Sequence, residues 1–150
     1  MKKIILIILI PFMVGIPGYL SFAADEVHVK KLQQTKKCNR CNLSGAQLNG
    51  ASLTRARLRG ANLSKAKLIG AKLRSADLRG ADLSRSDLRR ANLRSAKLSK
   101  ANLSRANLQG ANLRGADLRG ADFRDTQING ANFKGAKIKG AKGLPDDIDS

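Results

Sequence analysis

Large apolar side chains recur at every fifth residue between Cys41 and Gly140. The central residue of each five-residue unit is leucine in 16 of the 20 units. The residue two places before the centre is alanine in 17 units and another small residue in the rest. Asn or Asp directly precedes the centre in 12 units, and glycine ends 11 of them. The four centres that are not leucine are Phe123, Ile128, Phe133 and Ile138.

A period of five fits neither a helix nor a flat strand. Five residues turn an α-helix by roughly 500°, so successive leucines would share no face. On a flat strand an odd period places successive leucines on opposite faces. The pattern is consistent with a chain that turns a corner every five residues, so that the centre and the small residue before it both point inward. Glycine and Asn/Asp then suit the corners, because glycine tolerates unusual dihedrals and Asx side chains bond the local backbone.

These units resemble the motif A(D/N)LXX of the pentapeptide-repeat family, as in Ala61-Asn62-Leu63, Ala81-Asp82-Leu83 and Ala116-Asp117-Leu118. The resemblance covers residues 41–140. It implies an all-β fold, a right-handed quadrilateral β-helix with four pentapeptides per coil. Twenty units then make about five coils, and at a strand spacing of about 4.8 Å the stack is about 24 Å long.

Each coil of a solenoid depends on its neighbours, so both ends need a cap. For the N-terminal cap, residues 24–40, we expect a short helix between Asp25 and Lys37, because Val29 and Leu32 share one helical face. The C-terminal tail, residues 141–150, contains Leu144 and Ile148, which either fold over the last coil or leave the tail loose. Phe123 and Phe133 are ten residues apart, and we interpret them as core filling in the terminal coil rather than as an aromatic binding site.

The N-terminus has the organisation of a signal peptide. Lys2 and Lys3 precede an apolar run that begins at Ile4, and small residues at Ser21 and Ala23 predict cleavage between Ala23 and Ala24. Residues 1–23 would then be removed and the protein exported to the periplasm or cell envelope. The alternative is an uncleaved segment that anchors the protein in the inner membrane, since the uncharged run is about as long as a membrane span.

Two cysteines, Cys38 and Cys41, form a C-x-x-C pair just before the first full repeat. A zinc site would need further ligands, and covalent haem attachment would need histidine where Asn42 stands. In an oxidising compartment a local disulfide is expected. Two buried thiols and a redox role are the alternatives that the sequence leaves open.

The sequence contains no arrangement of residues typical of an enzyme. His28 is the only histidine, and it lies in the expected cap helix. We find no nucleophile–base pair, no pair of carboxylates and no glycine-rich phosphate loop. We therefore expect a protein without catalytic activity, cofactor or metal.

The chain is strongly basic, with 29 Lys and Arg against 11 Asp and Glu and a formal charge of +18. With four units per coil, 12 of the 15 net positive charges of the repeat region fall on two adjacent faces. We take these faces as candidate anion-binding surfaces. One column of stacked cations consists of Arg74, Arg94, Arg114 and Lys134, and the second consists of Arg59, Arg79, Arg119 and Lys139.

Stacked like charges lower stability unless an anion lies against them. The expected partner is lipid phosphate, lipopolysaccharide or an acidic polymer, with nucleic acid as a partner only if the chain is not exported. The alternative is a structural or protein-interaction rod whose charge only keeps it soluble. Family members that protect DNA gyrase imitate DNA with an acidic surface, and the opposite charge of this chain disfavours that role.

Overall fold

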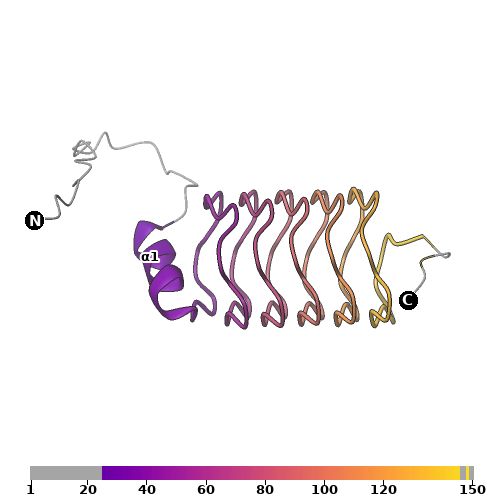
Figure 1. Cartoon of the computed structure of the whole chain (residues 1–150), viewed down its shortest axis with the longest axis horizontal. Helices are drawn as coiled ribbons and strands as arrows, with labels where there is room; N and C mark the ends of the chain where they lie inside the picture. The colour runs from indigo at the N-terminus through magenta and orange to yellow at the C-terminus, as the bar shows by residue number, and fades with distance from the viewer. Residues whose placement is uncertain (1–24, 146–147, 149–150) are drawn as a thin grey trace, which may run out of the picture.

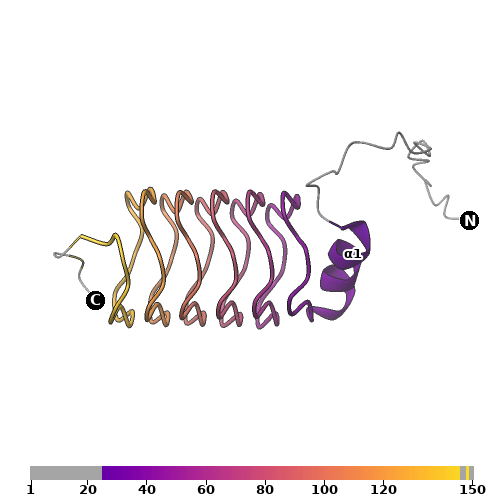
Figure 2. The ribbon, with the colours of Figure 1, turned by 180° about the vertical axis from the view of Figure 1, so that it is seen from behind.

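The computed structural model describes residues 25–145 and residue 148. Figures 1 and 2 show a single helix at one end of a rod of stacked coils, with the chain advancing along the rod by one coil at a time. Within the described residues no helix is long and apolar enough to cross a membrane. The predicted signal segment and the cleavage site between Ala23 and Ala24 lie outside the described residues.

Helix α1 (Glu26–Thr35) covers the first coil. Its N-cap is Asp25, whose side chain accepts a hydrogen bond from Val27 N at 3.0 Å. It ends because Lys36 adopts a left-handed conformation, with φ 55°, and donates its backbone N–H to Leu32 O at 2.8 Å. Leu32 is fully buried and joins the core of the rod. The short helix expected between Asp25 and Lys37 is therefore present.

The coils are joined by parallel bridges between residues 20 apart, from Lys37↔Arg57 to Asp122↔Lys142. Four pentapeptides per coil, which the family resemblance implied, follow directly from this spacing. The register begins at Lys37, so the stretch expected to form the cap, residues 24–40, contains both α1 and one side of the first coil. The handedness of the coil stays a prediction.

The backbone forms the parallel ladder expected of a β-helix, but its strands are reduced to single bridged residues. A corner every five residues leaves only one bridged residue on each side, so the described residues contain isolated bridges instead of extended strands. Each side still makes a parallel ladder: Leu63 N donates to Asp82 O at 2.7 Å, and Asp82 N donates to Ala61 O at 2.9 Å.

The Asn or Asp before each central residue supplies an acceptor that the backbone lacks. In a typical unit, the N–H groups of Ala66, Asn62, Leu63 and Lys65 all find backbone carbonyl partners. The N–H of the residue after the centre does not, and Ser64 N instead donates to Asn62 Oδ1 at 3.0 Å. The same bond forms in all 12 units that carry Asn or Asp at this position. The side chain thus completes the hydrogen bonding of the corner.

The interior of the rod is a stack of leucine and alanine. The leucines from Leu43 to Leu118 are all at most 2% exposed. At the C-terminal end the rings of Phe123 and Phe133 meet edge to face, with centroids 6.1 Å apart, so they fill the core as expected. Partly buried Leu144 and Ile148 pack against this end, which favours the folded tail over the loose one.

The last residue of every unit has a positive φ, from 55° at Arg40 to 73° at Gly140. The left-handed residue is the third residue of a turn in which Ala46 N, for example, donates to Leu43 O at 3.1 Å, and this explains why glycine is frequent there. Gly143 is a stricter case. A Cβ at Gly143 would lie 2.7 Å from Arg124 N, whereas a Cβ at Gly80 would meet nothing within 4 Å.

We expect Gly143→Ala to open the C-terminal end of the rod. The added methyl group would push the chain away from Arg124 and break the bond from Phe123 N to Lys142 O, which is 2.7 Å long. Amide hydrogen exchange at Phe123 should become faster than in the control Gly80→Ala, which carries the same left-handed strain of about 1–2 kcal/mol without the clash. Equal exchange at Phe123 in the two variants would contradict this role of Gly143.

Candidate functional site

The cations singled out in the sequence lie at corners of the rod, directly after the central residues. We call Arg74, Arg94, Arg114 and Lys134 the Arg74 column, and Arg59, Arg79, Arg119 and Lys139 the Arg79 column. The side of the rod between them is called the intervening side. Successive members of the Arg74 column are one coil apart, because Ser75 N donates to Arg94 O and Ser95 N donates to Arg114 O, both at 2.9 Å.

The Arg79 column is partly neutralised by aspartates of its own repeats. Arg79 Nε donates to Asp77 Oδ1 at 2.7 Å, and Arg119 makes two bonds of 2.8 Å to the carboxylate of Asp117. These hydrogen bonds from arginine lower the pKa of both aspartates. The column also has a gap, because Ser99 stands where a cation would complete it. Only part of the charge predicted for this column is therefore available to a partner.

The Arg74 column has no such neutralisation. Arg94 and Arg114 follow asparagines, whose Oδ1 atoms accept only the backbone N–H of the arginine, at 3.2 Å and 3.1 Å. Lys134 is placed in the same way, with its N–H 3.0 Å from Asn132 Oδ1. All four side chains of the column are exposed. Within the described residues no hydrogen bond or ion pair engages their charged ends.

The choice between Asp and Asn therefore decides the surface charge without affecting the corner. Both residues accept the backbone N–H, but only Asp also pairs with an arginine two residues later. The same pairing occurs in Asp87–Arg89 and Asp122–Arg124. Counting charges by face missed these pairs, although the triplets Asp-Leu-Arg and Asp-Phe-Arg in the sequence contain the signal.

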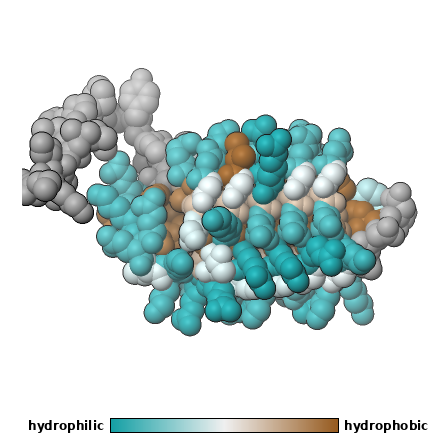
Figure 3. Space-filling model, in the orientation of Figure 1, coloured by the Kyte–Doolittle hydropathy of each residue, from teal (hydrophilic) through white to brown (hydrophobic). Residues whose placement is uncertain are grey.

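The intervening side carries charges that alternate along the rod. Bridges join Arg57 to Asp77, Asp77 to Lys97, Lys97 to Asp117 and Asp117 to Lys137. Opposite charges are thus cross-strand neighbours, an arrangement that stabilises the ladder. In Figure 3 hydrophilic side chains cover most of the visible face of the rod. The Arg74 column is the longest unpaired run of cations at the corners of the described coils.

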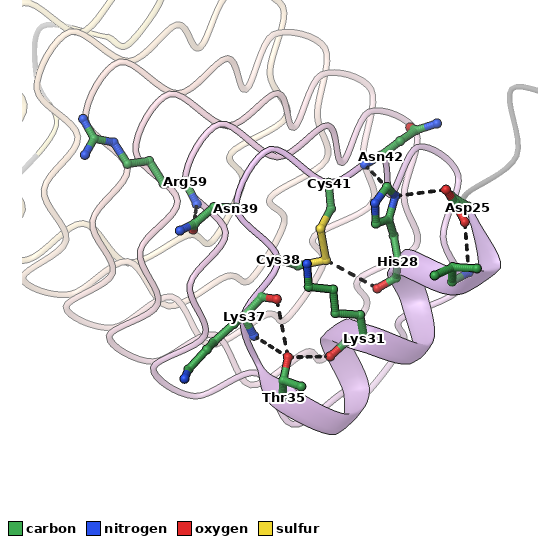
Figure 4. The surroundings of a disulfide bond; sticks show 11 residues. Asp25, His28, Lys31, Thr35, Lys37, Cys38, Asn39, Cys41, Asn42 and Arg59 are labelled. Atoms are coloured by element: carbon green, nitrogen blue, oxygen red, sulfur yellow. Dashed lines mark hydrogen bonds and ion pairs between the residues drawn. A yellow bond between two sulfur atoms is a disulfide. The ribbon is translucent and has the colours of Figure 1, made fainter.

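A disulfide joins Cys38 and Cys41 across the first corner of the rod, with their Cα atoms 5.3 Å apart (Figure 4). Cys38 is fully buried and Cys41 is 3% exposed, because both side chains point inward beneath α1. His28 O lies 3.4 Å from Cys38 Sγ. His28 Nδ1 lies 3.2 Å from Asp25 Oδ2 and 3.3 Å from Asn42 N, so the histidine connects α1 to the first coil. Within residues 25–145 no cluster of His, Cys, Asp or Glu could hold a metal ion.

We expect the two cysteines to resist alkylation in the folded protein purified without a reductant. Both sulfur atoms are bonded and lie beneath α1, so an alkylating reagent should label them only after denaturation and reduction together. Peptide mass mapping after each treatment checks this. Labelling of the native protein without a reductant would show free thiols instead.

We expect the carboxyl group of Asp122 to titrate at about 2. Hydrogen bonds from the side chain and the backbone N–H of Arg124 hold the pKa of Asp122 below its ordinary value of 3.8. A lowered pKa in the folded state adds stability above the unfolded pKa, and this stability is lost as pH falls from about 4 through about 2. NMR titration of the carboxyl carbon measures it, and a midpoint near 4 would contradict the pairing.

Asp122→Asn removes the negative charge but keeps the oxygen that accepts the backbone N–H of Arg124, so it tests the contribution of the charge alone. This variant should melt at a lower temperature than the native protein at pH 7, and the difference should narrow at pH 2. Asp82→Asn is the matched control, since Ser84 and not arginine follows Asp82 by two residues.

Comparison with known proteins agrees with this architecture. The family model described as pentapeptide repeats matches residues 41–80, 71–110 and 106–142. The crystal structure of the pentapeptide repeat protein Rfr23 from the cyanobacterium Cyanothece 51142 is 31% identical, with a TM-score of 0.52, and covers 83% of this chain and 99% of its own.

Trypsin-treated QnrB1 R167E, a plasmid-mediated fluoroquinolone resistance protein, is 22% identical with a TM-score of 0.56, over 63% of this chain and 58% of its own. At that identity the likeness shows the fold alone. A comparison with curated proteins gives no significant match. The repeat motif, the 20-residue ladder and these matches together show that the chain belongs to the pentapeptide-repeat family.

Proposed function

We propose that this protein is a non-catalytic binding protein of the cell envelope that docks on an anionic partner through the Arg74 column. The observation that carries the proposal is the lack of acidic partners along this column, in contrast to the paired arginines at Arg79 and Arg119. Export belongs to the proposal and rests on the N-terminal sequence. Lipid phosphate, lipopolysaccharide and acidic polymers all offer the required charge outside the cytoplasm.

The arrangement has an energetic cost that an anion would remove. Neighbouring unit charges at a coil spacing of about 4.8 Å repel by about 1 kcal/mol in water. This spacing is shorter than the screening length of about 8 Å at physiological salt. Long side chains reduce the cost by spreading apart, and a bound anion would replace the repulsion with attraction. The folded backbone keeps the Cα positions of the cations in line, so binding has to order only their side chains.

Docking of this kind would be electrostatic and not hydrophobic. Val27 on α1 is the only large hydrophobic residue that is exposed in the described chain, at 71%, and it lies at the capped end of the rod. The remaining exposed surface offers charged and polar groups. Counterion release then governs the affinity, and four contacts would weaken binding roughly 50-fold between about 50 and 200 mM salt.

We expect the triple variant Arg74→Glu/Arg94→Glu/Arg114→Glu to lose most binding to an anionic surface. The measurement is cosedimentation with phosphatidylglycerol vesicles and with lipopolysaccharide at low and high salt. The affinity should fall at least tenfold, because the variant replaces attraction by repulsion along the column.

The matched control is Arg85→Glu/Arg90→Glu/Arg105→Glu, which changes the net charge equally at other corners. It should retain most of the binding. If both triple variants lose binding to the same extent, the charge acts diffusely and the column is not a docking site. If neither loses binding, the protein is better described as an interaction rod with incidental charge.

A further inference from the structure

We infer that the partner is a linear acidic polysaccharide that lies along the axis of the rod, over the Arg74 column, with one carboxylate for each coil. This inference rests on the proposed function and names the class of partner. The geometry of the column, the residues on either side of it and the composition of the other corners carry the inference.

The column is straight and evenly spaced because the backbone ladder sets its repeat. The bonds Ser75 N to Arg94 O, Ser95 N to Arg114 O and Gly115 N to Lys134 O are 2.9, 2.9 and 3.0 Å long. Four cations therefore recur at the strand spacing of about 4.8 Å and span about 14 Å. In an extended polymer of uronic acids each ring adds a similar length and carries one carboxylate. Successive rings turn about the polymer axis, so their carboxylates do not all face one side. The long, exposed side chains of the column can reach around the polymer to pair with one carboxylate each, and guanidinium binds carboxylate with two parallel hydrogen bonds.

Short polar residues line the column on both sides. Before its last three cations lie Asn92, Asn112 and Asn132, whose Oδ1 atoms accept backbone N–H groups. Their amide nitrogens have no partner within the described part of the chain. After the cations the corner is formed by small residues that leave room for sugar rings. These small residues are Ser75, Ser95, Gly115 and Gly135.

The column therefore presents hydrogen-bond donors without any carboxylate beside them. The four units that carry it, residues 71–75, 91–95, 111–115 and 131–135, contain no Asp or Glu. Hydroxyl and carboxylate oxygens of a sugar polymer are acceptors for guanidinium, ammonium and amide N–H groups. The donors match a ligand that is rich in oxygen along its whole length.

The other corners lack this combination. Arg105 Nε lies 3.4 Å from Asp125 Oδ2 at one corner. Arg89 is paired with Asp87 at the next, where the neighbouring positions along the rod are the uncharged Ile69 and Gln109. The Arg79 column has two paired arginines and the gap at Ser99.

A line of charge at a corner suits a polymer better than a membrane. A bilayer contact would need a flat side. Laying the intervening side on lipid would bring Asp77 and Asp117 against the anionic headgroups, and the ladder on the other side of the column offers Lys72 as its one cation among the described residues. Large apolar side chains add little to such a contact in the described residues, since the exposed Val27 lies on α1 and Ile69, at the neighbouring corner, is only partly exposed. A polymer contacts one corner and avoids both difficulties.

Binding of galacturonate oligomers of two to eight units to the purified protein tests the inference, with phosphatidylglycerol vesicles as the comparison. The affinity should rise steeply with each unit up to four and change less than about threefold from five to eight, because the column has four cations. The slope of log K against log salt for the tetramer should be about −3, from about 0.7 for each contact.

A variant pair separates the column from general charge. Asn92→Asp/Asn112→Asp should reduce the affinity for the tetramer at least tenfold, because each new carboxylate pairs with Arg94 or Arg114 as Asp117 does with Arg119. Asn49→Asp/Asn129→Asp changes the net charge equally at another corner and should change the affinity less than twofold. At Asn92 and Asn112 an aspartate would accept the same backbone N–H as Asp82 does in its own repeat, so the fold is kept. Circular dichroism checks the fold of both variants.

The outcomes distinguish the inference from the proposed function. If vesicles bind and depend on Arg74, Arg94 and Arg114 but no oligomer binds, the partner is a lipid surface and the inference is wrong. If the affinity for oligomers rises steadily to eight units, or is unchanged in Asn92→Asp/Asn112→Asp, binding depends on the overall positive charge of the protein and the inference is again wrong. If neither vesicles nor oligomers bind at low salt, the proposed function fails as well.

Discussion

The parallel bridges between residues 20 apart, formed by backbone hydrogen bonds, are the constraint on which the rest of the structure depends. They join every side of each coil to the same side of the next, as between Leu63 N and Asp82 O. A residue type that recurs with this period is therefore stacked along the rod. Leucine stacks form the core, and arginine stacks form lines of charge. The interior and the surface of the protein follow from one register.

The corners make this register possible. Each one requires a left-handed residue, and most also supply an acceptor for the N–H that the ladder leaves unpaired. Glycine meets the first need in 11 of the 20 units, and ten other residues accept the strain, counting Arg40. Asn or Asp meets the second. The repeats of Arg59 and Ile69 lack Asn or Asp before the central residue. The backbone N–H groups of these two residues donate instead to Asn39 Oδ1 and Asn49 Oδ1 of the preceding coil, both at 3.0 Å. The acceptor can thus come from the same repeat or from the preceding coil. The corner at Arg74 forms although its N–H has no acceptor within the described residues.

Much of the fold could be predicted from the sequence, because a strict period leaves few arrangements for the chain. The inward positions, the short helix and the core role of Phe123 follow from spacing and residue size. The number of sides per coil came only from the family resemblance. A period of five gives the position of each corner but not the angle through which the chain turns there. The β-helix was expected to begin at Cys41, with Lys37 left in the cap, since Lys36 is not small and Cys38 is not a typical large apolar centre. Burial of Cys38 depends on α1, which the repeat pattern does not include.

The candidate site was less predictable, because the availability of a charge depends on its neighbours. The formal charges of the Arg74 and Arg79 columns are equal, but hydrogen bonds within a repeat separate them. Asp117 ties Arg119 to the surface, while Asn112 leaves the guanidinium of Arg114 unpaired, although both residues perform the same task for the fold. The family motif treats Asp and Asn as equivalent because the corner does. A partner that recognises the guanidinium does distinguish Asp from Asn, because only Asp pairs with the arginine. The residue before the centre therefore determines which lines of charge on the rod are available for binding.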